Sequence, residues 1–138
     1  MASTTATTEC TITNAAGQNL VLALSNYETA AGTINNTGTA TFTQTMPAIY
    51  LNGALVYEVG RSLKWINFWT TDNQVSTKMF QINDPIDWGQ VANNLRHGGS
   101  EDRITDTDGT EYSAWATIES NSIGQVLTAN ILASPVPN

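Results

Sequence analysis

The side chains that could carry out catalysis are few in this chain, and they form no recognisable set. Acyl transfer needs a nucleophile, a base and a third group that orients the base. His97 is the single histidine, and the chain has no Gly-x-Ser-x-Gly turn that would present a serine to it. We therefore predict no catalytic residues and no enzymatic activity, and expect His97 at the end of a helix. Pairs of carboxylates that folding brings together, as in glycosidases, are the alternative.

Cys10 and the acidic stretch 101–111 are the remaining candidates for a reactive or metal-binding group. Cys10 is the single cysteine, which excludes an internal disulfide and a thiolate-rich metal site. Its alternating surroundings predict a buried, unreactive thiol. Asp106, Asp108 and Glu111 gather around a glycine, but Glu111 comes too early for an EF-hand loop. We predict no metal and no cofactor, and a solvated acidic turn here, with a calcium loop as the alternative.

The aromatic residues are the strongest candidates for a binding site. In the predicted strand 63–69, Trp65 and Trp69 project to one side, while Ile66 and Phe68 project to the other. Both faces are therefore apolar, whereas a sheet in a two-layer sandwich has only one face against the core. The second face is either covered by the segment around Trp88, or it is a surface for a ligand, a membrane or a second copy of the chain.

The candidate ligand-binding residues share an amphipathic ring, of the kind that stacks on sugars or lies at the depth of lipid headgroups. These residues are Trp65, Trp69, Trp88, Tyr50, Tyr112 and Trp115. One strand carries more aromatic surface than a two-layer protein can bury, so the binding hypothesis expects these rings to be exposed. The alternative is that the face with Trp65 and Trp69 is part of the core.

The elements that carry these rings are predicted to be strands. Abundant Thr, Asn, Ser and Gly, with few charged residues, favour short strands joined by polar turns. Alternation predicts a hairpin over 10–24, and a second hairpin joins 112–119 to 125–132. Asn52-Gly53 predicts a tight turn between 49–51 and 55–59.

One segment departs from the strand pattern. Trp88, Val91 and Leu95 recur at helical spacing after Asp84, and Asp84 or Asp87 can cap the start of a helix. We therefore predict an all-β protein, a two-layer antiparallel β-sandwich of about eight or nine strands with one short helix. It forms a single β-sandwich domain over residues 1–138, with frayed ends at 1–8 and 134–138.

Charge narrows the choice of partners. The chain has 138 residues and a formal net charge of −7 at pH 7, so it repels phosphate backbones, and nucleic acid is excluded. The first residues lack the pattern of a secretory signal, and no apolar run reaches the roughly 18–20 residues that span a bilayer. We expect no signal peptide and a cytoplasmic or non-classically secreted protein.

Three parts of the sequence resemble the aegerolysins and their small crystal-toxin relatives. They are the opening Thr11–Leu22, the central Gly53–Glu58 with the following Leu63–Trp69, and the closing Tyr112–Ile118. The resemblance implies a β-sandwich that binds a membrane lipid headgroup, such as that of a sphingolipid. It also implies pore formation together with a larger protein partner, as a component of a cytolysin, a hemolysin-like toxin.

We therefore expect a recognition protein without catalytic chemistry that binds a membrane lipid headgroup through exposed aromatic rings. A neutral or zwitterionic headgroup suits an acidic protein better than an anionic one. A carbohydrate-binding lectin that uses Trp, Asn and Asp side chains is the alternative. A homo-oligomer or a complex with a protein partner follows if the second apolar face is an interface.

Overall fold

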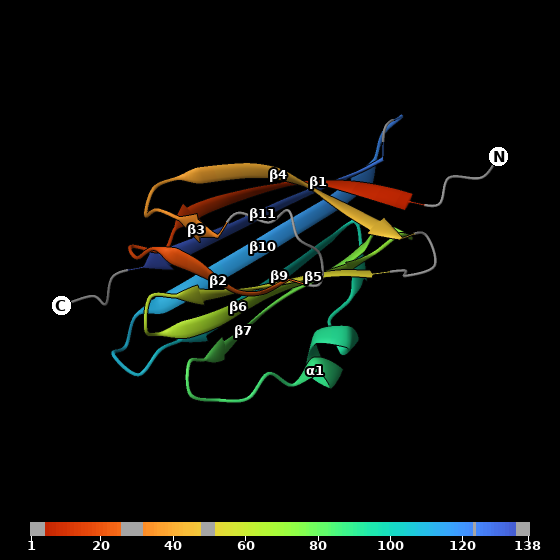
Figure 1. The fold of residues 1–138 in the computed structure, drawn as a ribbon. Coiled ribbons are helices and arrows are strands. Elements are labelled where there is room, and N and C mark those ends of the chain that lie inside the picture. Colours follow the sequence, from red (N-terminus) through yellow and green to blue (C-terminus); the bar gives the residue numbers. More distant parts are fainter. Residues whose placement is uncertain (1–4, 26–31, 48–51, 123, 135–138) are drawn as a thin grey trace.

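The computed structural model describes residues 5–25, 32–47, 52–122 and 124–134, which form two facing β-sheets and one short helix (Figure 1). The five-stranded sheet contains, in order, β4 (Thr39–Pro47), β1 (Thr5–Ala15), β11 (Gln125–Ser134), β10 (Glu111–Ser120) and β9 (Gly99–Thr105). The six-stranded sheet contains, in order, β3 (Thr33–Ile34), β2 (Leu20–Ser25), β5 (Asn52–Val59), β6 (Leu63–Thr70), β7 (Gln74–Gln81) and β8 (Arg96–His97). The predicted all-β sandwich with one short helix is confirmed.

Two pairings differ from the sequence expectations. β1 does not form a hairpin with β2, because the chain crosses after Ala15 from the five-stranded to the six-stranded sheet. β1 instead pairs in parallel with β11, so the sandwich is not wholly antiparallel. β1 starts at Thr5 and pairs with β4 from there, whereas residues 1–4 of the predicted frayed end lie outside the described residues.

The local predictions have mixed outcomes. The hairpin of β10 and β11 is confirmed by their antiparallel register. The prediction of a tight turn at Asn52-Gly53 is wrong, because both residues begin β5 and pair with β6. Residues 48–51, which include the predicted partner segment, lie outside the described residues. The helix is confirmed as α1 (Trp88–Asn93), and the carboxylate of Asp87 accepts the backbone N–H of Gln90 at 3.1 Å as its N-cap.

The core lies between the sheets and contains the indoles of Trp65 and Trp69, both 0% exposed. The inward face of β10 and β11 makes room for them with Ala114, Ala116 and Ala129. Both indole N–H groups are satisfied, since Trp65 donates to the Thr77 hydroxyl at 2.7 Å and Trp69 to the Thr8 hydroxyl at 3.1 Å.

The opposite face of β6 is covered by α1. Ile66 packs with Val56 and with Val91 of the helix, and the half-buried Phe68 and Phe80 surround them. The covered-face alternative is therefore the correct one for this strand, and β6 leaves no aromatic face exposed. No helix in the described part of the chain has the length and apolar character needed to cross a membrane.

The close packing of Trp69 against Gly53 yields a prediction about stability. A Cβ atom at Gly53 would lie 2.3 Å from the Trp69 ring, which is closed in by the core. We expect Gly53→Ala to destabilise the fold by about 1–3 kcal/mol, as overpacking does in a filled core. Gly32→Ala is the matched control, because nothing lies within 4 Å of the added atom. Equal urea midpoints for the two variants would contradict the packing described.

Candidate functional site

The six predicted binding residues do not come together in one site. Trp65, Trp69 and Tyr112 are core residues, and the expectation that their rings are exposed is wrong. The Tyr112 hydroxyl accepts a hydrogen bond from the Gln18 side chain at 2.7 Å, so even its polar end is engaged inside the protein. The physical reason is that each of these rings lies on the strand face that looks between the sheets. Tyr50 lies outside the described residues.

Trp88 and Trp115 are exposed, each with 42% of its surface accessible. Trp88 is the first residue of α1. Trp115 lies in β10, where buried residues alternate with exposed ones, and it points to the outer face of the five-stranded sheet. The rings that remain available to a ligand are therefore on different elements.

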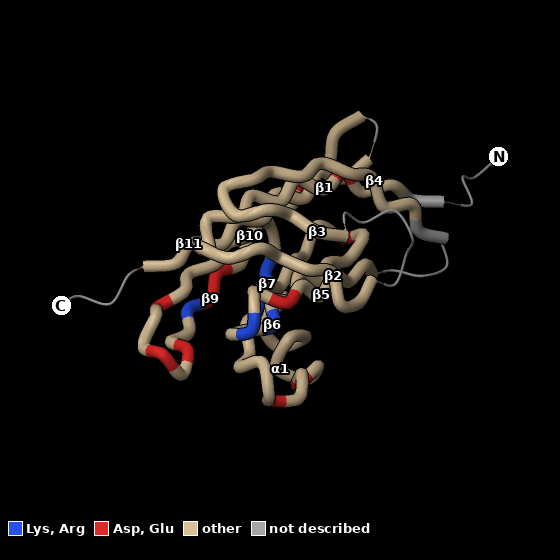
Figure 2. Tube along the Cα trace, turned by 60° about the vertical axis from the view of Figure 1, so that its left-hand side comes forward, with Lys and Arg blue, Asp and Glu red and all other residues tan. Residues whose placement is uncertain are grey.

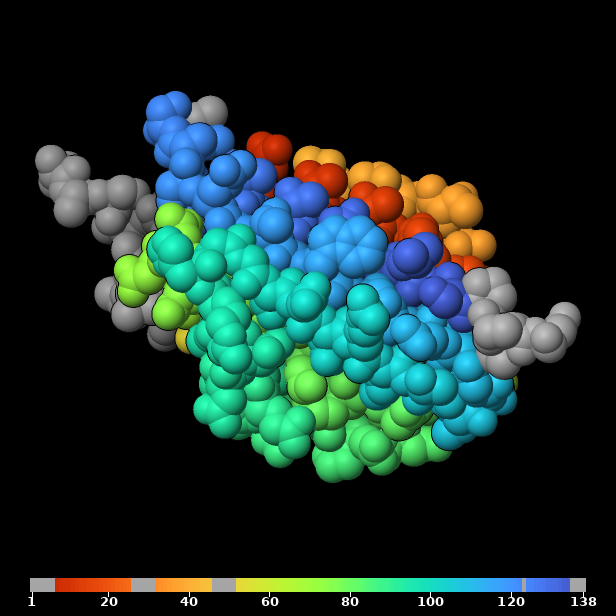
Figure 3. Space-filling view, turned by 180° about the vertical axis from the view of Figure 1, so that it is seen from behind, coloured from red at the N-terminus to blue at the C-terminus, as the bar shows by residue number. Residues whose placement is uncertain are grey.

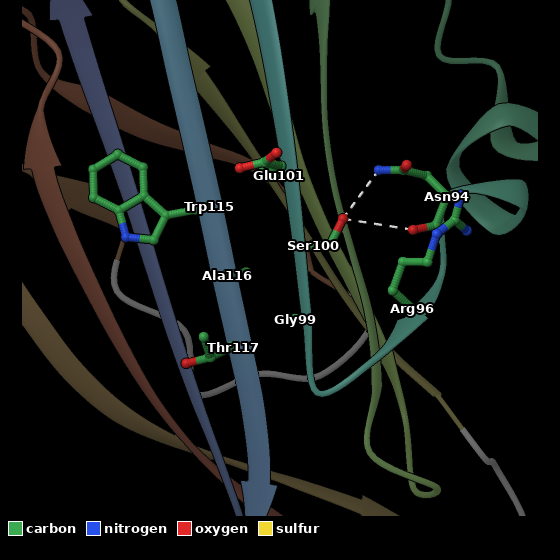
Figure 4. A pocket seen from close by; sticks show the side chains of 8 residues that line it. All are labelled: Asn94, Arg96, Gly99, Ser100, Glu101, Trp115, Ala116 and Thr117. Carbon is green, nitrogen blue, oxygen red and sulfur yellow. Dashed lines mark hydrogen bonds between the residues drawn. The ribbon is translucent and has the colours of Figure 1, made fainter.

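Trp115 borders a hollow of about 480 Å³ in the protein surface (Figure 4). Its lining comes from the segment after α1, from β8, and from the adjacent strands β9 and β10. The lining residues are Asn94, Arg96, Gly99, Ser100, Glu101, Trp115, Ala116 and Thr117. Figure 4 shows the Trp115 ring on one side, Asn94 and Arg96 on the other, and the strands β10 and β9 between them.

The wall beside α1 is held by a hydrogen-bond network. The Asn94 side-chain amide donates to the Ser100 hydroxyl and to the Thr77 carbonyl, both at 3.0 Å. The same hydroxyl accepts the backbone N–H of Thr77 at 3.2 Å. The end of α1, β7 and β9 are thereby tied together, which keeps this wall of the hollow in place before a ligand arrives.

Two charged side chains add to the polar lining. The Arg96 guanidinium donates to the carbonyls of Asn93 and Leu95 at 2.9 and 2.8 Å, which restrains its position. Glu101 is exposed and lies directly opposite Trp115 in the register of β9 and β10. The hollow thus offers a flat apolar ring together with a carboxylate, a guanidinium, an amide and hydroxyl groups.

The surface around Trp115 is mostly uncharged and polar. One row of neighbours crosses the sheet from Trp115 on β10 to β4. It continues through Asn130 of β11 and Thr13 of β1 and ends at Thr39 of β4. The space-filling view in Figure 3 shows this face, with β4 and β1 along one rim and β9 and α1 on the opposite side. Leu132, the exposed apolar neighbour on β11, lies diagonally from Trp115 in the register.

Trp115 was predicted as a binding residue from the sequence, whereas the rest of the hollow was not. A signal for its orientation was present, since Ser113 and Thr117 flank Trp115 at two residues' distance and mark a polar strand face. Arg96, Ser100 and Glu101 gave no comparable signal, because their role depends on how the segment after α1 folds beside β10.

The other candidate groups do not line the hollow. His97 is exposed in β8, opposite Gln74 of β7, and is not at the helix end where it was expected. The Asp106 carboxylate accepts the backbone N–H groups of Asp108 and Thr110, both at 2.9 Å, and so shapes the β9–β10 turn. No group of three or more His, Cys, Asp or Glu side chains able to hold a metal occurs in the described residues.

Cys10 is buried in the core, and burial raises the pKa of its thiol to about 12, with a smaller contribution from Glu9. At mildly alkaline pH the folded protein then carries almost no thiolate, the form that attacks disulfide reagents. We expect no reaction of the native protein with a chromogenic disulfide, and full reaction after unfolding in guanidinium chloride. Rapid labelling of the folded protein would show that the thiol is accessible.

Comparisons with known proteins bear on the fold. No protein-family model and no curated protein sequence matches the chain. A variant of the Xerocomus chrysenteron lectin with three methionine substitutions superposes with a TM-score of 0.51 and 12% sequence identity, over 96% of this chain and 100% of the lectin. The wild-type lectin gives a TM-score of 0.48 and 13% identity, over 94% and 99% of the two chains. The first comparison shows a shared overall fold.

Proposed function

We propose that this protein is a non-enzymatic recognition protein that binds a saccharide in the Trp115 hollow. The observation that carries the proposal is the half-exposed indole of Trp115, which lines one hollow together with Glu101, its neighbour on β9, and with Arg96 on the opposite side. A pyranose has an apolar face that stacks on an aromatic ring, and hydroxyl groups that donate to carboxylates and accept from guanidinium and amide groups. The fold shared with a lectin supports the same direction.

A lipid headgroup, which the aegerolysin resemblance implies, is the other candidate ligand. The other large apolar side chains that are exposed among the described residues are spread over β2, α1 and β11; they are Val21, Leu24, Trp88 and Leu132. The described part of the chain therefore has no single apolar surface of the size that membrane docking uses. The two indoles that supported a lipid-binding face, Trp65 and Trp69, are in the core. Saccharide binding is therefore favoured over insertion into a lipid surface.

The proposal is tested with a glycan array, followed by calorimetric titration with the free saccharide of the strongest hit. We expect binding to at least one neutral glycan, and free saccharide should displace the protein from the immobilised form. Sphingolipid and sterol vesicles form the second arm of the experiment. No glycan hit, combined with vesicle binding that free saccharide leaves unchanged, would overturn the saccharide proposal in favour of the lipid headgroup.

A further inference from the structure

Within the described residues the two sheets end in four edge strands, and these edges differ in how they are protected. The edges are β4 and β9 in the five-stranded sheet, and β3 and β8 in the six-stranded sheet. An unprotected edge strand presents backbone N–H and C=O groups that can pair with another strand. β3 and β8 have two residues each, which is too short to serve as a template.

The side of the sandwich formed by β7 and β9 is closed by side chains. The Asp102 carboxylate of β9 accepts the backbone N–H of Met79 at 2.8 Å and lies 3.4 Å from the Lys78 ammonium. The Ser100 hydroxyl accepts the backbone N–H of Thr77 in the same way. β9 also carries Glu101, Asp102 and Arg103, and charge on an edge discourages pairing with another chain.

β4 shows none of these protecting features in the part of the chain that the structure describes. It is nine residues long, carries no charged residue, and contains a proline only at its last position. Figure 2 shows the Lys, Arg, Asp and Glu positions on other segments, with β4 uncharged along its course. Although the chain has a net charge of −7, a second copy can approach this edge without bringing like charges on the two strands together.

The hydrogen bonding next to β4 shows which of its backbone groups point outward. The N–H of Asn14 donates to the carbonyl of Gly38 at 2.9 Å, and bonded and non-bonded pairs alternate along an antiparallel ladder. Ala40 and Phe42 then bond to β1, while the N–H groups of Thr39 and Thr41 point away from it. The hydroxyl oxygens of Thr11 and Thr41 lie 3.4 Å apart. This short separation agrees with the assignment of Thr11 and Thr41 as a non-bonded pair, because side chains are closest in such pairs.

We propose that the first part of β4, residues 39–42, pairs in antiparallel fashion with the same part of β4 in a second copy of this chain, across a two-fold axis. Such an isologous contact joins two five-stranded sheets into one continuous ten-stranded sheet. Ala40, Phe42 and Leu22, which are only partly buried against the core, lie toward this open side of the sandwich and gain cover from the partner. The exposed threonines form cross-strand pairs like those that β4 already makes with β1.

The dimer has a consequence for recognition that rests on the proposed saccharide function. Both copies of Trp115 lie on the same outer face of the joined sheet. The strands between them are β10, β11, β1 and β4 of one copy, followed by β4, β1, β11 and β10 of the other. This order has seven steps from strand to strand, which span roughly 34 Å at ~4.8 Å a step. Two sites on one face bind a surface rich in glycans with an avidity that exceeds the affinity of either site.

The test compares the mass in solution of the wild-type chain with that of two variants at one position, by sedimentation velocity over a concentration series. Thr41→Pro removes an outward N–H group and leaves the ladder with β1 intact, so we expect a monomer. Thr41→Val keeps the N–H group and the strand preference, so we expect a dimer as in the wild type. A monomeric wild type, or an equally dimeric Thr41→Pro variant, would overturn the proposal.

Two controls keep the outcome interpretable. Far-ultraviolet circular dichroism establishes that the variants are folded. Should Thr41→Pro fail to fold, a Thr39→Lys and Thr41→Lys double variant supplies the same disruption through charge repulsion between copies. Binding of a soluble monosaccharide, measured by calorimetry, does not depend on dimerisation. A monomer that still binds the sugar would overturn the dimer and leave the proposed function in place. A dimer that binds no sugar would overturn the proposed function and leave the dimer in place.

Discussion

Trp115→Ala is expected to weaken saccharide binding by roughly tenfold to a hundredfold, because stacking on an aromatic ring contributes about 1–3 kcal/mol. The ring supplies the only aromatic surface among the residues that line the hollow. Its removal leaves Glu101 and Arg96 able to form hydrogen bonds, but without the surface that orients a sugar ring toward them. Calorimetric titration of the best array hit into wild type and variant measures the loss directly.

The matched control for this variant is Trp88→Ala. Trp88 is as exposed as Trp115 but lies at the start of α1 and does not line the hollow. We expect unchanged saccharide affinity for the control, and melting temperatures close to wild type for both variants, since both side chains are at the surface. Equal loss of affinity in the two variants, or none in Trp115→Ala, would contradict the placement of the site.

Trp69→Ala is expected to lower the free energy of unfolding by about 3–5 kcal/mol, the usual cost of removing a large aromatic side chain from a core. Trp69 is 0% exposed, touches the Gly53 backbone position, and donates its indole N–H to Thr8. Its removal leaves a cavity between the sheets, and the Thr8 hydroxyl loses one of its two hydrogen bonds, keeping the one that it donates to Gln125. Urea unfolding monitored by circular dichroism measures the change.

Trp69→Phe separates the two contributions, because it keeps most of the apolar volume and loses the hydrogen bond to Thr8. We expect a smaller loss of stability for this variant than for Trp69→Ala. If Trp69→Ala instead kept full stability and lost saccharide binding, Trp69 would be a ligand-binding residue and its place in the core would be wrong.

Much of the fold could be predicted from local pattern. Alternation in β10 and β11 placed both strands and their hairpin correctly, because a strand with one buried face repeats every two residues. Apolar residues on both faces of β6 indicated that something covers the second face. The helical spacing of Trp88 and Val91 identified the element that does so, through contacts of Val91 with Ile66.

The same pattern did not determine which strands become neighbours. β1 and β2 alternate in the way a hairpin does, yet β1 pairs with β11 at the other end of the chain. Alternation shows that a strand has a buried face, but it carries no information about the partner that covers its edge. For the same reason, the excess of aromatic surface on β6 left open whether its indoles face a ligand or the core.

The sequence by itself determined the class of this protein: an acidic, all-β sandwich with one short helix and no recognisable catalytic set. Only the tertiary structure decided that Trp65 and Trp69 are core residues, and that Trp115 shares a hollow with Arg96 and Glu101. The physical reason is that periodicity along the chain reports local burial, whereas a site is assembled from segments whose proximity depends on sheet order and on the packing of α1.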